Sequence, residues 1–379
     1  MALRVGIVGK RGGSVAAGLR SVAGVEIAAL CELDPEAATR EAENLGIART
    51  VTQLDDLFEL CDAIVVATPM HLHVSQCVRA LNAGKHVLSE VTAAVSLEEC
   101  WRLLDAVQSS KGSYMMAENY CTFHDNVLVL ELVRKGFFGN PYYGEGEYLH
   151  DVKDYHHTSG GGRTWRYYWQ VGQNGVTYGT HSLGPVMQWL TALDPTDRIE
   201  SVVCLGSGRH TDSEHPHDDT STMLCHLASG KLVRVRLDML SNRPAQHGYY
   251  ALQGTGGVYE CSRFSGEPGR VWFDDHKTAE HDRTWEPLSA FEEHLPADYR
   301  ECEAEAAKSG HGGGDYFMGR LFAQSCLDGT TPLIDVYQAL EWTAAGLCSQ
   351  TSIESGGVPI RVPNFRNTAE RPVWLDSTR

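Results

Sequence analysis

The stretch LSEVTAA places Glu90 at the end of an apolar run, where a buried strand should stop. Ligands bind at the carboxyl ends of parallel strands in open α/β sheets, so Glu90 is a candidate site residue. Val91 and Thr92 follow it, and neither side chain carries a proton that moves near pH 7. If oxidation or reduction takes place here, other side chains must transfer the protons.

Tyrosine, histidine and glutamate side chains that can transfer protons occur in three other stretches. Tyr148 and His150 lie in GEYLHD, a strand-like run in which alternate side chains share a face. Tyr178 and His181 precede an apolar helix-like segment, and Glu118 follows a short apolar run. A tyrosine has an ordinary pKa of about 10, so it needs a neighbouring histidine or positive charge to act as a base. The alternative for each ring is a core position with a hydrogen-bonded polar tip.

A glycine-containing loop after the first apolar run predicts a dinucleotide site. Gly9, Gly12 and Gly13 in VGKRGGS allow close approach of a phosphate, although their spacing differs from G-x-G-x-x-G. Glu32 ends the second apolar run, where an acidic side chain can accept hydrogen bonds from ribose hydroxyls and repel a 2′-phosphate. This combination favours NAD over NADP, and a surface carboxylate near a helix start is the alternative for Glu32.

The stretch ATPMHLH belongs to the same predicted edge of the sheet. Thr68 and Pro69 end the strand-like run DAIVVA, and His71 and His73 begin the next helix-like segment. A single histidine at such a place is more often structural, but the carboxyl edge of a parallel sheet favours ligand binding.

These stretches require a fold that alternates strands and helices, and residues 1–122 show that alternation. The expected strands are Leu3–Val8, Val25–Leu30, Ala63–Ala67, His86–Ser89 and Tyr114–Ala117. The expected helices are Ser14–Val22, Pro35–Asn44, His71–Asn82 and Leu97–Ser109. We therefore predict the α/β class, with a doubly wound parallel sheet and an NAD-binding Rossmann domain over residues 1–122.

Residues 123–379 predict an α+β domain for substrate binding and oligomerisation. The expected elements are a helix at 125–135, strands within 142–150, 201–208, 220–228, 231–239 and 248–255, and helices at 183–193 and 333–349. Short turns between the later strands favour a large, open and mostly antiparallel sheet, and the helix at 333–349 is a candidate to pack back on the first domain. Residues 264–315 lack a clear period and predict long surface loops with some helix.

Composition argues against several classes of protein. The net charge of −17 disfavours nucleic acid and anionic membranes as partners. No apolar stretch reaches the ~18–20 residues that cross a bilayer, and the N-terminus lacks the sections of a secretory signal. The eleven cysteines are scattered without a C-x-x-C motif, which indicates reduced thiols rather than a zinc site. We expect a cytoplasmic protein without a metal, and the open sheet predicts a homodimer or homotetramer.

Four stretches, ATPMHLH, AGKHVLSE, MAENY and GTHSLGPVMQWL, resemble the glucose–fructose oxidoreductase/inositol dehydrogenase (Gfo/Idh/MocA) superfamily, and the resemblance covers nearly the whole chain. Typical dehydrogenases of that superfamily carry E-K-P where this chain has Glu90-Val91-Thr92, and their lysine serves the hydroxyl that is oxidised. They also commonly carry aspartates where this chain has Thr177 and Gly184. Two parts of an ordinary dehydrogenase site are therefore absent.

The chain is also similar to a narrower family, the NAD-dependent α-N-acetylgalactosaminidases among the glycoside hydrolases, which have E-V in place of E-K. The corresponding patterns here are GKRGGS, MMAENYC, GEYLHD, TWR, TYGTHSLGP and HGGGDY. The chain differs at VTYGTH, where the family has L-Y-P-T-H, and it lacks the secretion signal common there. The identity of the sugar therefore stays open.

This second resemblance implies net hydrolysis with a cofactor that is regenerated. NAD takes a hydride from C3 of the sugar, the ketone acidifies the hydrogen on C2, and a base removes that proton while the C1 substituent leaves. Water then adds at C1, and NADH returns its hydride. No facing pair of carboxylates, as in an ordinary glycosidase, is required. A tightly bound, recycled NAD and a small carbohydrate or glycoside substrate are expected.

The resemblance also implies roles for individual residues. Tyr178 and His181 are assigned to the C3 hydroxyl and Tyr148 to C2, whereas Glu118 helps with proton transfer or holds the nicotinamide ribose. The predicted catalytic residues are Tyr148, Tyr178, His181 and Glu118. The predicted cofactor-binding residues are Gly9, Lys10, Arg11, Gly12, Glu32, Thr68, Pro69, His71, Glu90, Val91 and Asn119. The predicted substrate-binding residues are His150, Trp165, Arg166, Tyr178 and His181.

Three further motifs have a structural and a functional interpretation. HTDSEHPHDD, residues 210–219, lacks the spacing of a metal site, and a solvated loop is expected. HGGGD, residues 311–315, predicts the start of a helix with Asp315 near the cap. The aromatic run WRYYW, residues 165–169, is expected to line a sugar subsite, with packing between subunits as the alternative.

Two other functions stay open at this point. One is an ordinary NAD-dependent sugar or cyclitol dehydrogenase in which His181 replaces the lysine. The other is a non-catalytic nucleotide-binding protein. Presence of the four predicted catalytic residues together argues against the second, because a decayed pocket has no physical need for them.

Overall fold

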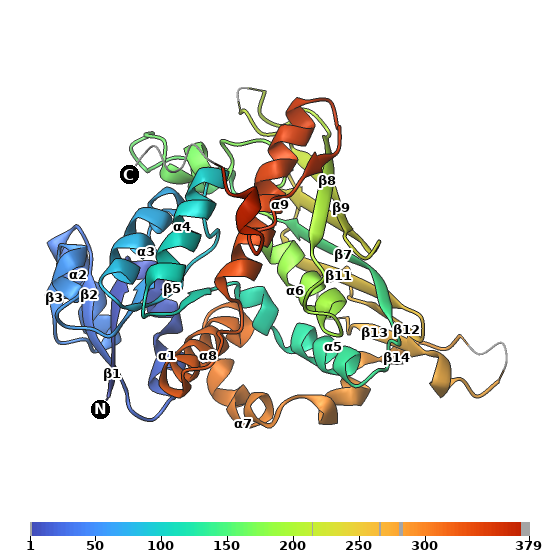
Figure 1. Cartoon of the computed structure of the whole chain (residues 1–379), viewed down its shortest axis with the longest axis horizontal. Coiled ribbons are helices and arrows are strands. Elements are labelled where there is room, and N and C mark those ends of the chain that lie inside the picture. The colour runs from blue at the N-terminus through green and yellow to red at the C-terminus, as the bar shows by residue number, and fades with distance from the viewer. Residues whose placement is uncertain (1, 214, 265–266, 280–282, 373–379) are drawn as a thin grey trace. The chain divides into compact units, whose positions relative to one another are not determined.

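The computed structural model describes residues 2–213, 215–264, 267–279 and 283–372. Contacts within the chain form two compact units, each built on one sheet (Figure 1). The described residues of unit 1 come from Met1–Thr122, Glu303–Glu341 and Asn364–Arg379, and those of unit 2 from Phe123–Cys302 and Trp342–Pro363. A late segment of the sequence therefore belongs to the same unit as the first sheet.

Unit 1 contains a six-stranded sheet in the order β3-β2-β1-β4-β5-β6, in which all neighbouring strands are parallel. Its strands are β1 (Leu3–Val8), β2 (Val25–Cys31), β3 (Thr50–Val51), β4 (Ala63–Val66), β5 (His86–Ser89) and β6 (Tyr114–Met116). The strand order reverses between β1 and β4, and ligands bind at this point in doubly wound sheets. The fold confirms the predicted class and places the glycine loop next to ATPMHLH.

The helices of unit 1 largely follow their predicted bounds. They are α1 (Ala16–Arg20), α2 (Pro35–Leu45), α3 (His73–Asn82), α4 (Leu97–Ser109) and α8 (Gly314–Asp328). Asp34 caps α2 by accepting hydrogen bonds from the amides of Glu36 and Ala37. α3 and α4 lie side by side (Figure 1), as expected for crossover helices that cover a parallel sheet.

The first crossover differs from the predicted helix Ser14–Val22. A 3-10 helix, Lys10–Val15, comes first because two successive glycines disfavour an α-helix, and α1 has only five residues. The late helix α8 packs directly on α1, where a Cβ on Gly18 would lie 1.8 Å from the carbonyl oxygen of Tyr316. The late segment that contains α8 therefore lies beside the glycine loop, residues 9–13.

Unit 2 contains a nine-stranded sheet in the order β14-β13-β12-β11-β7-β10-β9-β8-β15. Its strands are β7 (Pro141–Leu149), β8 (Ile199–Gly206), β9 (Thr220–Leu227), β10 (Leu232–Asp238), β11 (Gln246–Gly254), β12 (Gly257–Glu260), β13 (Arg270–Phe273), β14 (Glu286–Pro287) and β15 (Ile360–Arg361). Neighbouring strands are antiparallel except β7 and β10, which are parallel. The predicted large, mostly antiparallel sheet is confirmed.

The prediction of surface loops over residues 264–315 is wrong in part. β13 and β14 extend the sheet and were not predicted, whereas the helix α7 (Ala297–Ala306) agrees with the expected helical part. The two strands have four and two residues, which is too few to show an alternating period in the sequence. Their pairing with β12 and with each other defines them instead.

The remaining helices are α5 (His124–Arg134), α6 (Thr180–Thr191) and α9 (Val336–Glu354), and α9 begins in unit 1 and ends in unit 2. α6 packs on β7 through two glycines that have no side chain to hold it away. A Cβ on Gly146 would lie 2.0 Å from the carbonyl oxygen of Ser182, and one on Gly144 would lie 2.4 Å from Val186. The start of α6 therefore lies against the strand that carries Tyr148.

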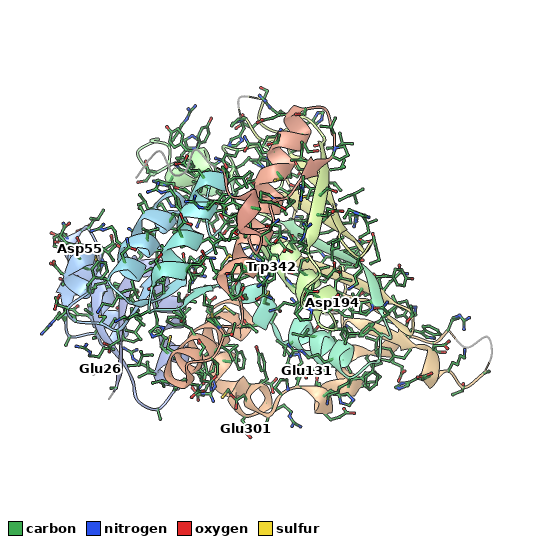
Figure 2. All side chains as sticks on the ribbon, in the orientation of Figure 1. Glu26, Asp55, Glu131, Asp194, Glu301 and Trp342 are labelled. Atoms are coloured by element: carbon green, nitrogen blue, oxygen red, sulfur yellow. The ribbon has the colours of Figure 1, made fainter. Side chains whose placement is uncertain are left out.

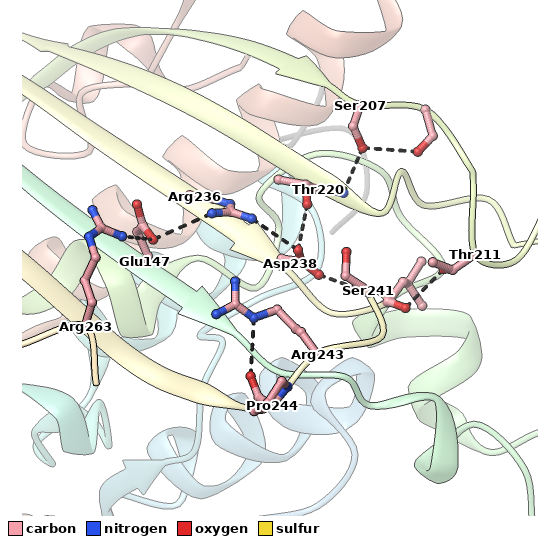
Figure 3. Close-up of polar contacts among 12 residues, drawn as sticks. Glu147, Ser207, Thr211, Thr220, Arg236, Asp238, Ser241, Arg243, Pro244 and Arg263 are labelled. Carbon is pink, nitrogen blue, oxygen red and sulfur yellow. Dashed lines mark hydrogen bonds and ion pairs between the residues drawn. The ribbon is translucent and has the colours of Figure 1, made fainter. Parts of the chain in front are cut away.

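Ion pairs on the opposite face hold β7 in register. The buried carboxylate of Glu147 lies 2.5 Å from Arg234 and 3.4 Å from Arg263. Arg236 lies 3.9 Å from Glu147 and extends the network across the sheet (Figure 3). Because alternate residues of a strand face opposite ways, this network fixes Tyr148 on the α6 side.

Charged side chains such as Glu26, Asp55 and Glu301 are exposed, whereas Trp342 is buried (Figure 2). All eleven cysteines are free thiols. Within the described ranges, no helix is long and apolar enough to span a membrane.

Candidate active site

The loop after β1 turns sharply at Gly9, close to the sheet. Gly9 has φ of 84°, and a Cβ there would lie 2.5 Å from the carbonyl oxygen of Ala67. Only glycine adopts this conformation at little cost in such a confined place. The Gly9 amide donates to Cys31 and the Gly12 amide donates back to Gly9, so the loop is closed against the sheet.

Glu32 lies at the end of β2, beside this loop. One carboxylate oxygen accepts a hydrogen bond of 3.3 Å from the Lys10 amide, and the other accepts one of 2.9 Å from the Leu33 amide. A carboxylate has about four lone-pair sites, so both oxygens can still accept hydrogen bonds from a ribose. The predicted role of Glu32 in holding the ribose stays a prediction.

The loops after β4 and β5 are joined by a histidine that the sequence analysis did not assign to the site. His73 is buried, and its ring nitrogens lie 2.8 Å from the carbonyl oxygen of Thr68 and 3.0 Å from that of Thr92. Burial lowers the pKa of His73, so the ring is neutral near pH 7. Thr68, Pro69 and His71 follow β4 as partly exposed residues of the joined loops.

Five polar residues of unit 1 are linked by hydrogen bonds and ion pairs. We call them the Asp315 network: Arg11, Glu90, Asn119, His311 and Asp315. Asp315 accepts a hydrogen bond of 2.7 Å from Asn119 and lies 3.2 Å from Arg11. The predicted helix start at HGGGD is confirmed, with Gly313 as the N-cap residue of α8 and Asp315 in its first turn near the cap, although no side chain caps the helix. Asp315 also joins predicted cofactor-binding residues from distant parts of the sequence.

Glu118 follows β6 and is fully buried. Its carboxylate accepts a hydrogen bond of 3.3 Å from the Tyr120 amide, and its carbonyl oxygen accepts one of 3.1 Å from the Cys121 amide. A buried carboxylate is costly without such donors, so the short 3-10 helix after β6 holds this side chain in place.

In unit 2, the structure brings four predicted residues together as a tyrosine–histidine cluster: Tyr148, His150, Tyr178 and His181. The hydroxyl of Tyr148 lies 2.8 Å from Nδ1 of His150, as their shared face predicts. The ring centroids of Tyr148 and His181 are 5.2 Å apart, and those of Tyr178 and His181 are 5.3 Å apart. Tyr250 fixes the start of α6 by donating a hydrogen bond of 2.6 Å to the carbonyl oxygen of His181.

His247 extends this cluster and was missed in the sequence. Its ring lies 4.3 Å from that of His150 and stacks on Tyr148 at 6.0 Å. Burial, followed by the charges of His247 and Arg166, lowers the pKa of His150 to about 4. His150 is therefore neutral near pH 7, and its Nδ1 can accept the hydrogen bond from Tyr148. Pairing of β11 with β7 across about a hundred residues of sequence is what places His247 there.

The predicted substrate residues Trp165 and Arg166 begin a single π-helical turn, Arg166–Gln170. The guanidinium of Arg166 lies 4.6 Å from the ring centroid of Trp165 and 5.7 Å from that of Tyr155, and it donates a hydrogen bond of 2.7 Å to Gln170. Such turns are frequent at functional sites. Together with the effect on His150, this geometry places Arg166 beside the tyrosine–histidine cluster.

The described residues of 210–219 form a loop, as predicted, but the expectation that it is solvated is wrong for two of its three histidines. His215 and His217 are fully buried, and the ring of His215 stacks on His156 at 5.2 Å. Tyr167 covers both stacked rings edge-on, at 5.9 Å from His156 and 5.0 Å from His215. Uncharged histidine rings can be buried among other aromatic rings, so the polar sequence of this stretch did not predict their exposure to solvent correctly. Over the part of the chain that the structure describes, no group of three or more histidine, cysteine or acidic residues is arranged to hold a metal ion.

Comparisons with known proteins divide the chain near residue 122, where the first stretch of unit 1 ends and unit 2 begins. Residues 123–371 match the family model of the glycosyl hydrolase 109 C-terminal domain. Residues 3–118 match the model of the oxidoreductase family with an NAD-binding Rossmann fold (Gfo/Idh/MocA).

Two relatives illustrate the likeness in sequence. A glycosyl hydrolase family 109 protein of Solibacter usitatus is 28% identical, and the alignment covers 96% of this chain and 88% of that protein. An α-N-acetylgalactosaminidase of Shewanella oneidensis is 28% identical, with 97% of this chain and 86% of that protein covered.

Solved structures show the same fold at lower identity. Levoglucosan dehydrogenase in complex with NADH has a TM-score of 0.79 at 18% identity, covering 96% of this chain and 100% of that one. The scyllo-inositol dehydrogenase of Lactobacillus casei has a TM-score of 0.67 at 16% identity, with 95% and 98% covered. With one family model matching most of the chain and the other its first sheet, the chain belongs to glycosyl hydrolase family 109, on the Gfo/Idh/MocA oxidoreductase fold.

Proposed function

We propose that the chain is an NAD-dependent glycoside hydrolase that works by transient oxidation at C3, elimination across C1 and C2, addition of water and re-reduction. The observation that carries the proposal is the tyrosine–histidine cluster in a chain of family 109. Val91 supports it, because dehydrogenases of this superfamily typically carry a lysine at that position. The α-N-acetylgalactosaminidase among the relatives supports a glycoside as the substrate class.

The residues of unit 1 fit a dinucleotide. The positive φ of Gly9 and the space that a Cβ would fill there suit a loop that approaches a diphosphate closely. Glu32 can accept hydrogen bonds from ribose hydroxyls, and Arg11 supplies a positive charge at the loop. When bound, NAD supplies a reversible hydride acceptor for a carbon of the substrate. Because net hydrolysis regenerates it in each turnover, we expect NAD to stay bound during purification.

Tyr148 is the proposed base for the C2 hydrogen. Its hydroxyl donates to the neutral ring of His150, which orients the phenol and can take the phenol proton as charge develops. Full transfer of that proton before the reaction would cost several kcal/mol, because a tyrosine pKa of about 10 lies far above that of His150. The two side chains therefore act as a relay in which the phenol oxygen receives the C2 proton while its own proton moves to His150.

Tyr178 and His181 are the proposed partners of the C3 hydroxyl. His181 can accept that proton when the C3 hydride leaves, either directly or through Tyr178, which takes the hydroxyl proton as its own phenol proton moves to His181. The edge-on contact between the rings keeps both polar groups at the start of α6. Glu118 is proposed to help with proton transfer or to hold the nicotinamide ribose. Its full burial suits either role.

A panel of nitrophenyl glycosides tests the proposal. The chain is incubated with each glycoside, with and without added NAD, and both nitrophenol and NADH absorbance are followed. Release of nitrophenol without net NADH supports the glycosidase. Steady formation of NADH identifies a sugar dehydrogenase, and no reaction with any glycoside or free sugar contradicts an enzyme of this class.

Isotope exchange tests the elimination route separately. Product formed in deuterated water should carry deuterium at C2, because the route breaks that bond and remakes it with solvent. Hydrolysis without label at C2 rules out the elimination step while leaving glycosidase activity itself in place.

A further inference from the structure

The turn that carries Asp315 has an unusual backbone. His311 has φ of 53°, and no other non-glycine residue in the described ranges has a positive φ. Gly312 and Gly313 follow with φ of 61° and 95°. A strained residue persists only where its surroundings hold it, and such residues concentrate at functional sites. Here the turn directs His311 and the first turn of α8 toward the nucleotide loop.

Asp315 is charged although it is buried. Its side chain is 3% exposed, its Oδ1 accepts from Asn119, and its Oδ2 lies 3.0 Å from His311 and 3.2 Å from Arg11. Burial by itself raises the pKa of Asp315, but the hydrogen bond from His311 and the charge of Arg11 outweigh it and hold the pKa well below its usual value. The hydrogen bond to Asp315 in turn raises the pKa of His311. A buried ion pair of this kind contributes little net stability, which favours a different use.

The partners of Asp315 are residues that the cofactor is expected to contact. Arg11 is 40% exposed, so its guanidinium can face a ligand while Asp315 and Glu90 hold it from two sides, at 3.2 Å and 3.4 Å. An arginine loses rotamer entropy when it is fixed, and these carboxylates fix it before the ligand arrives. Asn119, at the start of the 3-10 helix that follows β6, is held by Asp315 in the same way.

We propose that Asp315 is a positioning residue of the dinucleotide site, which holds Arg11 and Asn119 in the orientation in which they contact the cofactor. The inference rests on the proposed binding of NAD to unit 1. It assigns a binding function to the HGGGD turn, which lies far along the chain from the glycine loop. The competing explanation is that Asp315 only attaches α8 to the rest of unit 1.

Calorimetric titration of the full chain with NAD, after removal of any co-purified cofactor, measures the effect directly. Asp315→Asn keeps the shape and one acceptor for Asn119, but it removes the charge that holds Arg11. We expect the dissociation constant for NAD to rise at least about tenfold. Asp105→Asn is the matched control, because Asp105 pairs with Arg371 at 2.7 Å in the same unit, outside the site. It should leave the affinity unchanged.

A double-mutant cycle separates positioning from attachment. If Asp315 acts through Arg11, Asp315→Asn should weaken NAD binding much less in an Arg11→Gln background than in the natural chain. A purely structural role predicts the same fold-loss in both backgrounds, together with a lower melting temperature.

If Asp315→Asn does not fold, His311→Gln is the alternative variant. The His311 side chain is 44% exposed, so this change should leave the fold intact. It should weaken NAD binding several-fold, and an unchanged affinity contradicts the inference. If the natural chain binds NAD and none of these variants changes the affinity, only this inference fails. If the natural chain does not bind NAD at all, the proposed function fails with it.

Discussion

At the scale of single residues, Tyr148 illustrates how neighbours set the chemistry of a side chain. A buried phenol with only apolar contacts is a packing residue, whereas this one forms a hydrogen bond with one histidine and contacts the ring of a second. The difference lies in His150, whose pKa of about 4 keeps it uncharged and able to accept. In the proposed mechanism, no lysine is therefore needed to hold a proton acceptor next to the substrate.

The first prediction concerns Tyr148→Phe, which removes one oxygen and little volume. Hydrolysis should fall by about 10²–10⁴-fold, the usual contribution of a general acid or base, while single-turnover formation of NADH from the bound sugar persists. Stopped-flow absorbance and nitrophenol release measure the two steps. Tyr143→Phe is the matched control, because Tyr143 bonds to Glu145 on the same strand. Full hydrolytic activity of Tyr148→Phe would remove this residue from the mechanism.

The second prediction concerns Glu32→Ala. It removes the carboxylate that accepts from Lys10 and Leu33 and is proposed to accept from the ribose. NAD binding should weaken by about 1–3 kcal/mol, and Glu32→Gln, which keeps one acceptor, should lose less. Titration with NAD and NADP checks both points. Equal affinity of the natural chain for the two cofactors would contradict the role of Glu32.

At the scale of elements, the contact between α6 and β7 decides whether the tyrosine–histidine cluster exists. Gly144 and Gly146 have no side chains, which leaves space on one face of β7, and α6 fills that space. On the other face, Glu147 and its arginines fix the register of the strand (Figure 3). A shift by one residue would turn Tyr148 to the wrong side of the sheet.

The third prediction therefore concerns Gly146→Ala. The new Cβ would lie 2.0 Å from the carbonyl oxygen of Ser182, so α6 must move and take His181 with it. We expect a loss of stability of about 1–3 kcal/mol and a larger loss of turnover, measured by denaturant titration and by the glycoside assay. In the control Gly160→Ala, the nearest atom is the Thr158 hydroxyl at 3.9 Å, and neither quantity should change. Normal turnover in Gly146→Ala would show that the position of α6 is not critical.

At the scale of the whole molecule, buried histidines make stability depend on pH. Burial, and then the charge of neighbouring histidines, lowers the pKa of His156 and His215 to about 4. Their Nε2 atoms have no hydrogen-bond partner among the residues that the structure describes. In the unfolded chain both side chains return to the ordinary pKa of about 6.5, so the unfolded state binds more protons between those values.

The fourth prediction follows from the larger number of protons that the unfolded state binds in this pH range. As pH falls from about 6.5 to about 4, the free energy of unfolding should decrease by about 1–2 kcal/mol through these two rings, allowing for solvent screening. Asp315 does not contribute in this window, because the stability from a depressed carboxylate pKa is lost only below the ordinary value of about 4. Denaturant titrations at several pH values measure the slope. His156→Phe keeps the ring contact and should flatten it, whereas an equal slope in that variant would assign the effect elsewhere.

The sequence by itself determined the class of fold, many element bounds and the family. β1, β5 and α4 have the predicted bounds, because the two strands are short apolar runs buried on both faces and α4 buries one face whose apolar residues recur at helical spacing. The local sequence also identified Glu32 and Tyr148 as candidate site residues. It showed as well that no lysine follows Glu90. These features depend on residues that are neighbours along the chain.

Only the tertiary structure decided which distant residues meet. Asp315 reaches Arg11 because α8 packs on α1, and His247 reaches His150 because β11 pairs with β7. His215 is buried although its sequence is among the most polar in the chain, because aromatic rings from another segment cover it. Such contacts form because they belong to the packing of lowest free energy for the whole unit, and no local pattern of residue types specifies them.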